Sequence, residues 1–248
     1  MFNHYFRPAS FMLAASFLWP AIGFGESSGN EHKTWSGDAE LGYVSTAGNT
    51  ETSTLKARSD LRYEKESWRN LLHADALNTS EDDTRSAEKY FLSNKLDYKF
   101  SDRTYVFGFT SYEHDSFSGF KYQATAAAGI GYRLLQADTM TWDVEAGPGY
   151  RISKVDDDNT EDRDQRETIL RLSTKYSWKL SDNATFEQEA SVESGADNTV
   201  TRSITSLKTN IIGQLAMKLS YTLKSSSHVP SDTKHTDTET AVTLVYSY

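Results

Sequence analysis

The segment at residues 236–248 alternates along its length and constrains the fold more than any other part of the chain. Its even positions carry Thr238, Thr240, Val242, Leu244, Tyr246 and Tyr248. Its odd positions are more polar and include Asp237, Glu239, Thr243 and Ser247. A period of two predicts a β-strand with one apolar and one wetter face. The segment is slightly longer than the roughly 9–11 residues with which a tilted strand crosses a bilayer. A final aromatic residue is typical of the closing strand of an outer-membrane barrel.

Composition has to be considered together with this pattern, because alternation hides the apolar half of each strand. The chain has 248 residues, enough for one all-β barrel domain. Its mean hydropathy is negative. No run of about 18 apolar residues occurs, which excludes a helical membrane protein but not a barrel. Aromatic residues are plentiful, with 14 Tyr, 12 Phe and 5 Trp, whereas only 4 Pro occur, as expected where most backbone N–H groups join a ladder.

Cysteine content and charge exclude several classes of function. The sequence has no cysteine and a formal net charge of −9. A disulfide framework, a thiolate nucleophile, a cysteine metal site and a lipidated N-terminal cysteine are therefore excluded. The acidic balance argues against nucleic acid as a partner. The sequence contains no phosphate-binding glycine motif and no His/Asp ligand spacing, so we predict no cofactor and no metal site.

The first 25 residues have the pattern of a secretory signal peptide. Arg7 precedes an apolar core, Phe11–Phe24, that is too short to span a membrane. The alternative is a buried helix of the mature fold. We predict a signal peptide at 1–25, a short N-terminal lead-in at 26–34 and an outer-membrane β-barrel at 35–248.

From residue 35 onward the sequence divides into twelve segments with strand periodicity. They are Trp35–Ala47, Ser53–Tyr63, Trp68–Asn78, Ala87–Phe100, Thr104–His114, Phe120–Leu134, Met140–Ile152, Glu167–Leu180, Ala184–Glu193, Thr201–Ile212, Leu215–Ser225 and Thr236–Tyr248. Connections after the even-numbered segments are short, and those after the third, seventh, ninth and eleventh are longer and polar, as in barrels with short periplasmic turns. The connection after the first is short against this rule. We predict an all-β fold, a 12-stranded antiparallel transmembrane β-barrel of the bacterial outer membrane, whose closure leaves no unpaired edge in lipid.

The apolar face of these segments carries aromatic residues near the ends with short turns. They are Trp35, Tyr63, Trp68, Tyr98, Phe100, Trp142, Trp178 and Tyr248, joined by Leu134. This pattern is typical of an aromatic girdle at a membrane interface. The alternative is the core of a soluble sandwich, but the opposite face is too charged to form a second apolar layer. By the same alternation, Tyr105, Phe107 and Phe109 form the apolar face of the fifth segment.

The opposite face is predicted to line the lumen. Its candidate residues are Glu40, Lys56, Arg58, Asp60, His73, Asp75, Lys95, Asp97, Asp143, Glu145, Arg171, Lys175, Glu187, Glu189 and Lys208. Several neighbouring strands alternate in charge, so cross-strand pairs are expected at roughly 0.2–1 kcal/mol each. Two interpretations stay open: a lumen closed by ion pairs, or a narrow charged pathway for a small hydrophilic solute. Twelve strands give a bore between filled eight-stranded barrels and open porins.

Two further clusters contain residue types that can carry chemistry. The acidic segment from Asp156 to Glu167 resembles a calcium loop in its oxygen spacing, with Asp156, Asp158, Asp162 and Asp164 as weak cation ligands. Its sixth position is Glu161, where glycine is required, and a solvated acidic outer loop is the simpler interpretation. His114, Asp115 and Ser116 cannot form a catalytic relay in a strand, because adjacent side chains point to opposite faces. We therefore predict no catalytic residues.

The first two strands resemble a known family. The run GDAELGYVSTAGNTETSTL from Gly37 to Leu55 contains the pairs Gly42-Tyr43 and Gly48-Asn49-Thr50. Together with the Trp68 strand and the Tyr248 end, it resembles the salt-induced outer membrane protein family, also called domain-of-unknown-function family 481. The resemblance covers about 35–248. It implies a bacterial outer-membrane barrel of unassigned activity, linked by name to salt or acid stress, and it brings no catalytic residues.

The expected function is that of an outer-membrane barrel, either a narrow channel or an envelope-stabilising protein of a Gram-negative cell. The alternative is an interaction protein whose acidic outer loops bind cations, lipopolysaccharide or a partner. A lipid-acting enzyme is the least favoured class. Expected partners are outer-membrane lipid and lipopolysaccharide, and the barrel-assembly machinery through the strand that ends at Tyr248.

Overall fold

The computed structural model describes residues 34–46, 52–81, 84–116, 118, 120–155, 164–229 and 234–248. The predicted signal peptide and nearly all of the lead-in lie outside the described residues. No helix long and apolar enough to cross a membrane occurs in the described part of the chain.

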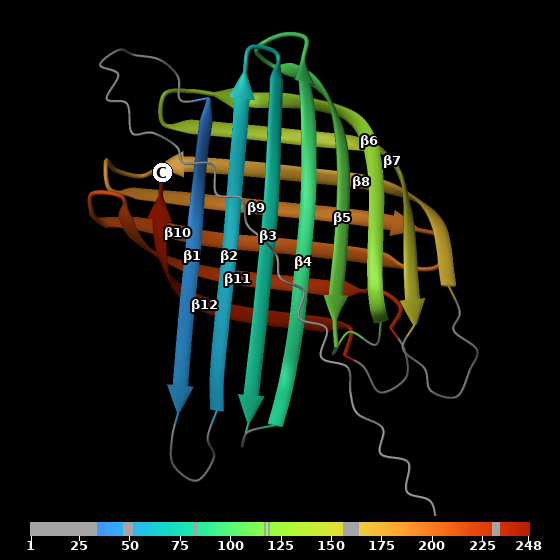
Figure 1. Ribbon diagram of the computed structural model, residues 1–248. Coiled ribbons are helices and arrows are strands. Elements are labelled where there is room, and N and C mark those ends of the chain that lie inside the picture. The colour runs from blue at the N-terminus through green and yellow to red at the C-terminus, as the bar shows by residue number, and fades with distance from the viewer. Residues whose placement is uncertain are drawn as a thin grey trace, which may run out of the picture. The chain divides into compact units, whose positions relative to one another are not determined.

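The described residues form twelve strands that close into a barrel (Figure 1). They are β1 Trp35–Thr46, β2 Thr52–Lys65, β3 Trp68–Glu81, β4 Thr84–Lys99, β5 Thr104–Asp115, β6 Phe120–Gln136, β7 Met140–Val155, β8 Asp164–Lys179, β9 Ala184–Gly195, β10 Thr199–Ile212, β11 Leu215–Ser226 and β12 Thr236–Ser247. Each strand pairs antiparallel with its sequence neighbours, and β1 pairs with β12. The front strands cross those at the back in Figure 1, as the tilted strands of a barrel do. The prediction of a twelve-stranded antiparallel barrel is confirmed.

The seam between the first and the last strand depends on a glycine. Tyr248 N donates to Gly37 O at 3.0 Å, and Gly37 N donates to Tyr248 O at 3.2 Å. A Cβ atom on Gly37 would lie 2.6 Å from the Tyr248 hydroxyl oxygen. Further along the seam Leu41 pairs with Leu244. The predicted closing segment therefore does close the sheet, so that neither β1 nor β12 is left as an edge.

Several strands extend further than the sequence predicts, and the longer connections are correspondingly shorter. β3 and β4 remain paired up to Glu81 and Thr84, so the predicted polar loop at 79–86 is wrong over most of its length. β9 and β10 likewise remain paired up to Ser194 and Thr199. The reason is that a hairpin ladder satisfies its backbone groups whether or not its side chains are apolar. Polar composition alone therefore does not end a strand.

The outer face of the barrel is apolar. Exposed large side chains on it include Trp35, Leu41, Tyr43, Trp68, Leu72, Leu92, Ile130, Trp142, Leu172, Leu219 and Leu244. The rings of Trp35 and Tyr63 lie 4.8 Å apart, and those of Trp68 and Tyr98 lie 4.9 Å apart. Both pairs lie at the end with the short turns, as predicted for the girdle. The inner face is charged, which is the reverse of a soluble domain and matches a barrel surrounded by lipid.

The fifth strand corrects one prediction. Tyr105, Phe107 and Phe109 lie on the inner face, where they are 3%, 3% and 9% exposed. Val106 and Tyr112 of the same strand are the residues that face outward. The three rings form an apolar cluster inside the lumen with one small neighbour from β6. The apolar character of alternate residues therefore gave the wrong face for this strand.

The register of β5 explains this orientation. Phe107 pairs with Asp97 of β4, and Phe109 pairs with Lys95. Residues directly opposite in an antiparallel pair project to the same face. Because Asp97 and Lys95 face the lumen, the two rings paired with them also face the lumen. On the other side Phe107 pairs with Gly129 of β6. That residue has no side chain, which leaves space for the rings inside the barrel.

The strands β6 and β7 approach each other closely at two glycines. A Cβ atom on Gly147 would lie 2.6 Å from the Cα atom of Gly129. Pro148, next along β7, has no N–H to donate. The two strands keep one register from the pair Ala127–Gly149 to the pair Ile130–Ala146, so Gly129 lies opposite Gly147. Glycine is required at this point because any side chain would separate the two backbones.

Candidate functional site

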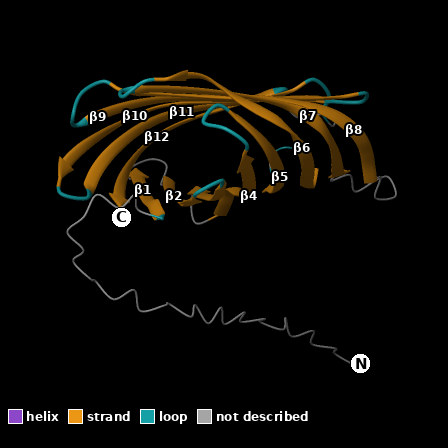
Figure 2. Cartoon of the chain, turned by 90° about the horizontal axis from the view of Figure 1, so that it is seen from above, coloured by secondary structure: helices purple, strands orange, loops and turns teal. Residues whose placement is uncertain are grey.

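The candidate site is the lumen, and all fifteen residues predicted to line it lie on the inner face of the barrel. Buried charged residues on this face include Glu40, Lys56, Arg69, Asp97, Glu113, Glu145, Arg151, Glu167, Arg171, Lys218 and Lys224. In the view along the barrel in Figure 2, the sheet curls so that β9–β12 face β1 and β2. Charged side chains buried away from bulk water are stable only when they are paired, and the described residues of the lumen form three such networks.

The first network centres on Glu40 of β1. Lys218 Nζ of β11 donates to Glu40 Oε1 at 2.7 Å, and Thr243 Oγ1 donates to Glu40 Oε2 at 3.1 Å. Arg58 Nε lies 3.6 Å from Glu40 Oε1. Nearby, Lys208 Nζ of β10 donates to an Asp38 oxygen at 3.0 Å. These contacts reach across neighbouring strands and fix the seam between β1 and β12 from the inside.

Two residues of β2 extend this network toward β3. Asp60 accepts from Arg58 Nε at 2.9 Å, and its other oxygen lies 2.7 Å from His73 Nδ1. His73 is therefore a lumen hydrogen-bonding group. On the same strand Lys56 forms ion pairs with Asp75 at 3.4 Å and with Glu239 of β12. The second of these reaches over β1.

The predicted acidic residues of β9 pair with β8. Lys175 Nζ lies 2.6 Å from Glu189 Oε1 and 3.9 Å from Glu187 Oε1. Lys175 is half exposed and lies on the wall of the lumen. These partners are on adjacent strands, so the ion pairs run along the wall.

The second network lies on β3, β4 and β7, near the short turns. Arg69 Nε donates to Asp97 Oδ2 at 2.6 Å, and Asp97 is fully buried. Lys95 forms an ion pair with Glu145 of β7. The Tyr105 hydroxyl donates to Glu145 at 2.9 Å, and its ring lies 5.0 Å from the Arg69 guanidinium carbon. One inward ring of β5 is thus held between a carboxylate and a cation.

Asp143 completes the second network. Arg133 donates to both of its oxygens, at 2.7 and 3.0 Å, in a bidentate pair. Arg69 Nη1 lies 3.6 Å from Asp143 Oδ2. The strands β3 and β7 are therefore linked across the barrel, because three strands separate them in the sheet.

The third network joins strands on opposite sides of the ring. Arg202 Nη2 of β10 donates to Glu113 Oε2 at 2.7 Å, and Lys224 Nζ of β11 lies 3.0 Å from Glu113 Oε1. Glu113 is on β5, and five strands separate β5 from β11 in either direction around the barrel. Lys89 of β4 adds a further cation 3.8 Å from Glu113. These contacts draw opposite walls of the lumen together near the end with the longer connections.

The wall beside this crossing is held by Arg151 of β7, which is 1% exposed. Arg151 donates to Glu167 Oε1 at 3.1 and 2.5 Å and to the backbone oxygen of Asn198 at 2.5 Å. Glu167 also accepts from the backbone N–H groups of Asp197 and Asn198, at 3.0 and 3.3 Å. Glu167 is therefore a buried structural acceptor that fixes the β9–β10 turn, and its carboxylate is engaged inside the barrel instead of in an outer cation loop.

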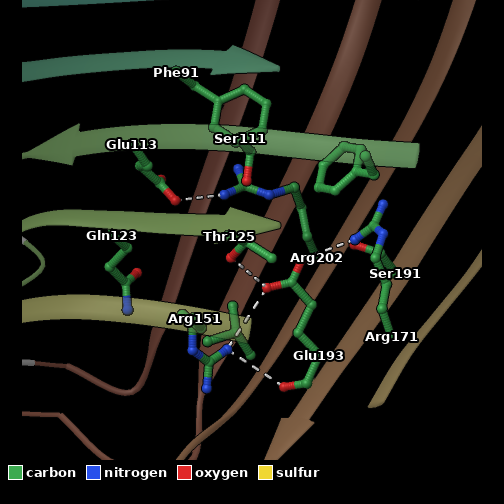
Figure 3. Close-up of a pocket in the computed structure, with 12 residues that line it drawn as sticks. Phe91, Ser111, Glu113, Gln123, Thr125, Arg151, Arg171, Ser191, Glu193 and Arg202 are labelled. Carbon is green, nitrogen blue, oxygen red and sulfur yellow. Dashed lines mark hydrogen bonds and ion pairs between the residues drawn. The ribbon is translucent and has the colours of Figure 1, made fainter. Parts of the chain in front are cut away.

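A cavity of about 60 Å³ lies directly beside the crossing (Figure 3). The aromatic and charged residues that line it are Phe91, Phe109, Glu113, Arg151, Arg171, Glu193 and Arg202. Arg171 Nη1 donates to Glu193 Oε1 at 2.8 Å, and its guanidinium carbon lies 3.9 Å from the Phe109 ring centre. Arg202 lies in the same way over Phe91, at 4.6 Å. Each guanidinium is thus fixed by a ring face and a carboxylate.

Sequence reasoning missed two important members of these networks, Arg69 and Glu113. Glu113 lies on the same face of β5 as Phe107 and Phe109, so the wrong face for these rings also placed Glu113 outside. Lys95 and Asp97 of β4, which pair with these rings, were the signal that could have corrected the face. Of the acidic loop candidates, Asp156, Asp158 and Asp162 lie outside the described residues. So does the side chain of Asp164.

Comparison with known proteins identifies the family. A family model described as "Protein of unknown function, DUF481" matches residues 39–248. The chain belongs to this family. The uncharacterized protein YdiY of Escherichia coli (strain K12) is 32% identical over 216 residues, which are 87% of this chain and 84% of YdiY.

Solved structures share the fold of this DUF481 barrel at low identity. The NanC porin superposes with a TM-score of 0.51 at 10% identity, over 85% of this chain and 98% of NanC. The translocator domain of the autotransporter NalP from Neisseria meningitidis gives 0.50 at 14% identity, over 88% of this chain and 89% of that domain. These likenesses establish a barrel of the outer-membrane type and leave the activity to be argued from the lumen.

Proposed function

We propose that this protein is a narrow channel of the outer membrane that passes ions and small hydrophilic solutes. The apolar outer face with aromatic pairs near the short turns supports a location in the bilayer. The charged inner face supports a polar route through it. A bore of twelve strands is intermediate between filled and open barrels, so the side chains inside decide what passes.

The single observation that carries the proposal is the crossing at Glu113. Its carboxylate contacts Arg202 and Lys224 of the opposite wall, at 2.7 and 3.0 Å. Ions and water can pass beside such contacts, whereas a sugar-sized solute requires the pairs to open. Glu113 is therefore the constriction of the proposed channel, and the strength of its ion pairs sets the conductance.

Planar-bilayer recording of the purified chain tests this proposal. We expect discrete conductance steps that are small compared with those of open porins, and Glu113→Gln should increase them because it weakens both cross-lumen contacts. Glu189→Gln is the matched control, since Glu189 pairs with Lys175 of the adjacent strand at 2.6 Å. Folded protein without any conductance would refute the channel. An equal increase of the conductance in both variants would show that Glu113 is not the constriction.

The same proposal includes the environment of the protein and its assembly. We place it in the outer membrane of a Gram-negative cell, in contact with lipid and lipopolysaccharide, without enzymatic activity. The strand that ends at Tyr248 and pairs with Gly37 is the element we assign to recognition by the barrel-assembly machinery. Fractionation of cells that express the chain, with and without the tyrosine side chain, measures both points. A role in salt stress rests on the family resemblance alone.

A further inference from the structure

The cavity beside the Glu113 crossing contains more positive than negative charge. It is lined by Arg151, Arg171 and Arg202, but only by two carboxylates, those of Glu113 and Glu193. The excess persists when the next contacts are included. Lys224 pairs with Glu113, and Glu167 pairs with Arg151. With Lys89, which lies 3.8 Å from Glu113, that gives five cations to three carboxylates.

One donor in this cavity is unused. Arg171 is 8% exposed, and its Nε is buried with no hydrogen-bond partner among the described residues. Its Nη1 is taken by Glu193, and the ring of Phe109 covers one face of the guanidinium. A buried N–H without a partner is energetically unfavourable, so a ligand that accepts from it is favoured.

The second guanidinium is arranged in the same way. Arg202 uses Nη2 for Glu113 and rests on the ring of Phe91. Arg151, in contrast, donates hydrogen bonds to the Glu167 carboxylate and to the backbone oxygens of Asn198 and Glu193. Figure 3 shows Glu193 between Arg171 and Arg151, and the Arg202 guanidinium directed toward Glu113. Arg171 with its unused Nε and Arg202, each fixed by a ring face and a carboxylate, form an anion site.

We propose that this cavity binds one small monovalent anion, a halide or a short carboxylate such as formate, between Arg171 and Arg202. A volume of about 60 Å³ corresponds to about four water-sized positions, which excludes sugars and larger acids. The anion balances the excess positive charge and accepts from the unused Arg171 Nε. In the proposed channel this site would favour anions over cations, and that consequence rests on the proposed function.

Binding is measured separately from conduction. The purified full chain in a nonionic detergent is titrated with chloride while the line width of the chloride NMR signal is recorded. We expect saturable broadening in the wild type that formate displaces and bulky gluconate does not. Arg171→Gln should lose it, whereas Lys175→Gln, which removes a lumen cation away from the cavity, should keep it. Glu193→Gln should bind more tightly, because it removes a negative charge from the lining.

The outcomes separate the two proposals. If the wild type shows no saturable broadening, or if Lys175→Gln loses it as fully as Arg171→Gln, the anion site is refuted. If broadening behaves as expected but bilayers show no conductance, the site stands and the channel fails. If the channel conducts, the reversal potential in a salt gradient should shift toward cations in Arg171→Gln, and an unchanged value contradicts anion preference. Should Arg171→Gln not fold, Arg202→Gln and the opposite effect of Glu193→Gln decide the question.

Discussion

Lys224 of β11 and Glu113 of β5 stand on opposite sides of a closed ring of twelve strands, and yet Lys224 Nζ lies 3.0 Å from Glu113 Oε1. Lys224 is 4% exposed and Glu113 is 6% exposed. Long side chains from both walls are needed to span the lumen, and Arg202 joins them from the strand beside β11. This contact joins opposite walls of the lumen directly.

The first prediction concerns the contribution of this contact to stability. Removing one partner of a buried ion pair leaves an uncompensated charge and typically costs about 3–5 kcal/mol. We expect Lys224→Met to lower the free energy of unfolding by an amount toward the lower end of that range, because Arg202 and Lys89 still neutralise Glu113. Urea unfolding from lipid vesicles measures the change. Lys179→Met, which breaks an exposed pair with Asp182 at 3.0 Å, should change it little.

A double-mutant cycle makes this prediction sharper. Lys224→Met combined with Glu113→Gln should cost less than the sum of the two single changes, since the double variant buries neither unpaired charge. Strict additivity would mean that the two side chains do not interact in the folded barrel, and would contradict the crossing.

The second prediction tests which face of β5 carries the aromatic rings. The chain has no cysteine, so single cysteines can be introduced without background. In lipid vesicles Val106→Cys should react with a lipid-soluble maleimide, because Val106 is 37% exposed on the outer face. Phe107→Cys, at a position that is 3% exposed inside the lumen, should be protected. The reverse pattern of labelling would show that the rings of β5 face the lipid and that Val106 faces the lumen.

The third prediction concerns the close approach of β6 and β7. Gly147→Val should reduce the yield of folded, heat-modifiable barrel, because its side chain would meet the backbone at Gly129, where even a Cβ would lie 2.6 Å from Cα. Overpacking of this kind costs about 1–3 kcal/mol or more. Ala146→Val is the matched control, since Ala146 is exposed on the outer face. Equal folding of the two variants would show that the strands can separate here without penalty.

Much of the site was predictable residue by residue. Alternation alone placed Glu40, Lys56 and Arg171 on the inner parity, because neighbouring side chains of a strand must point to opposite faces. It could not tell which residues of distant strands meet. Lys56 reaches Glu239 and Arg202 reaches Glu113 only because the ring closes with one register.

The error in β5 has a specific physical cause. Apolar residues identify the lipid face of a strand only where the alternate positions are polar. In this strand the alternate positions include Val106, Gly108 and Tyr112, which are not charged, so hydropathy does not distinguish the two faces. Pairing with Lys95 and Asp97 decides the face instead. The short turn between β4 and β5 sets that pairing, so the face follows from register and not from hydropathy.

By itself, the sequence determined the class of fold, the number of strands, the aromatic pairs near the short turns and the charged character of the lumen. These follow from periodicity and turn spacing, which are local properties of the chain. Only the tertiary structure decided that Tyr105, Phe107 and Phe109 line the lumen, that Glu113 bridges it and that Arg171 is left with an unused donor beside a cavity. The reason is that each of these depends on barrel closure and strand register, which bring together side chains far apart in sequence.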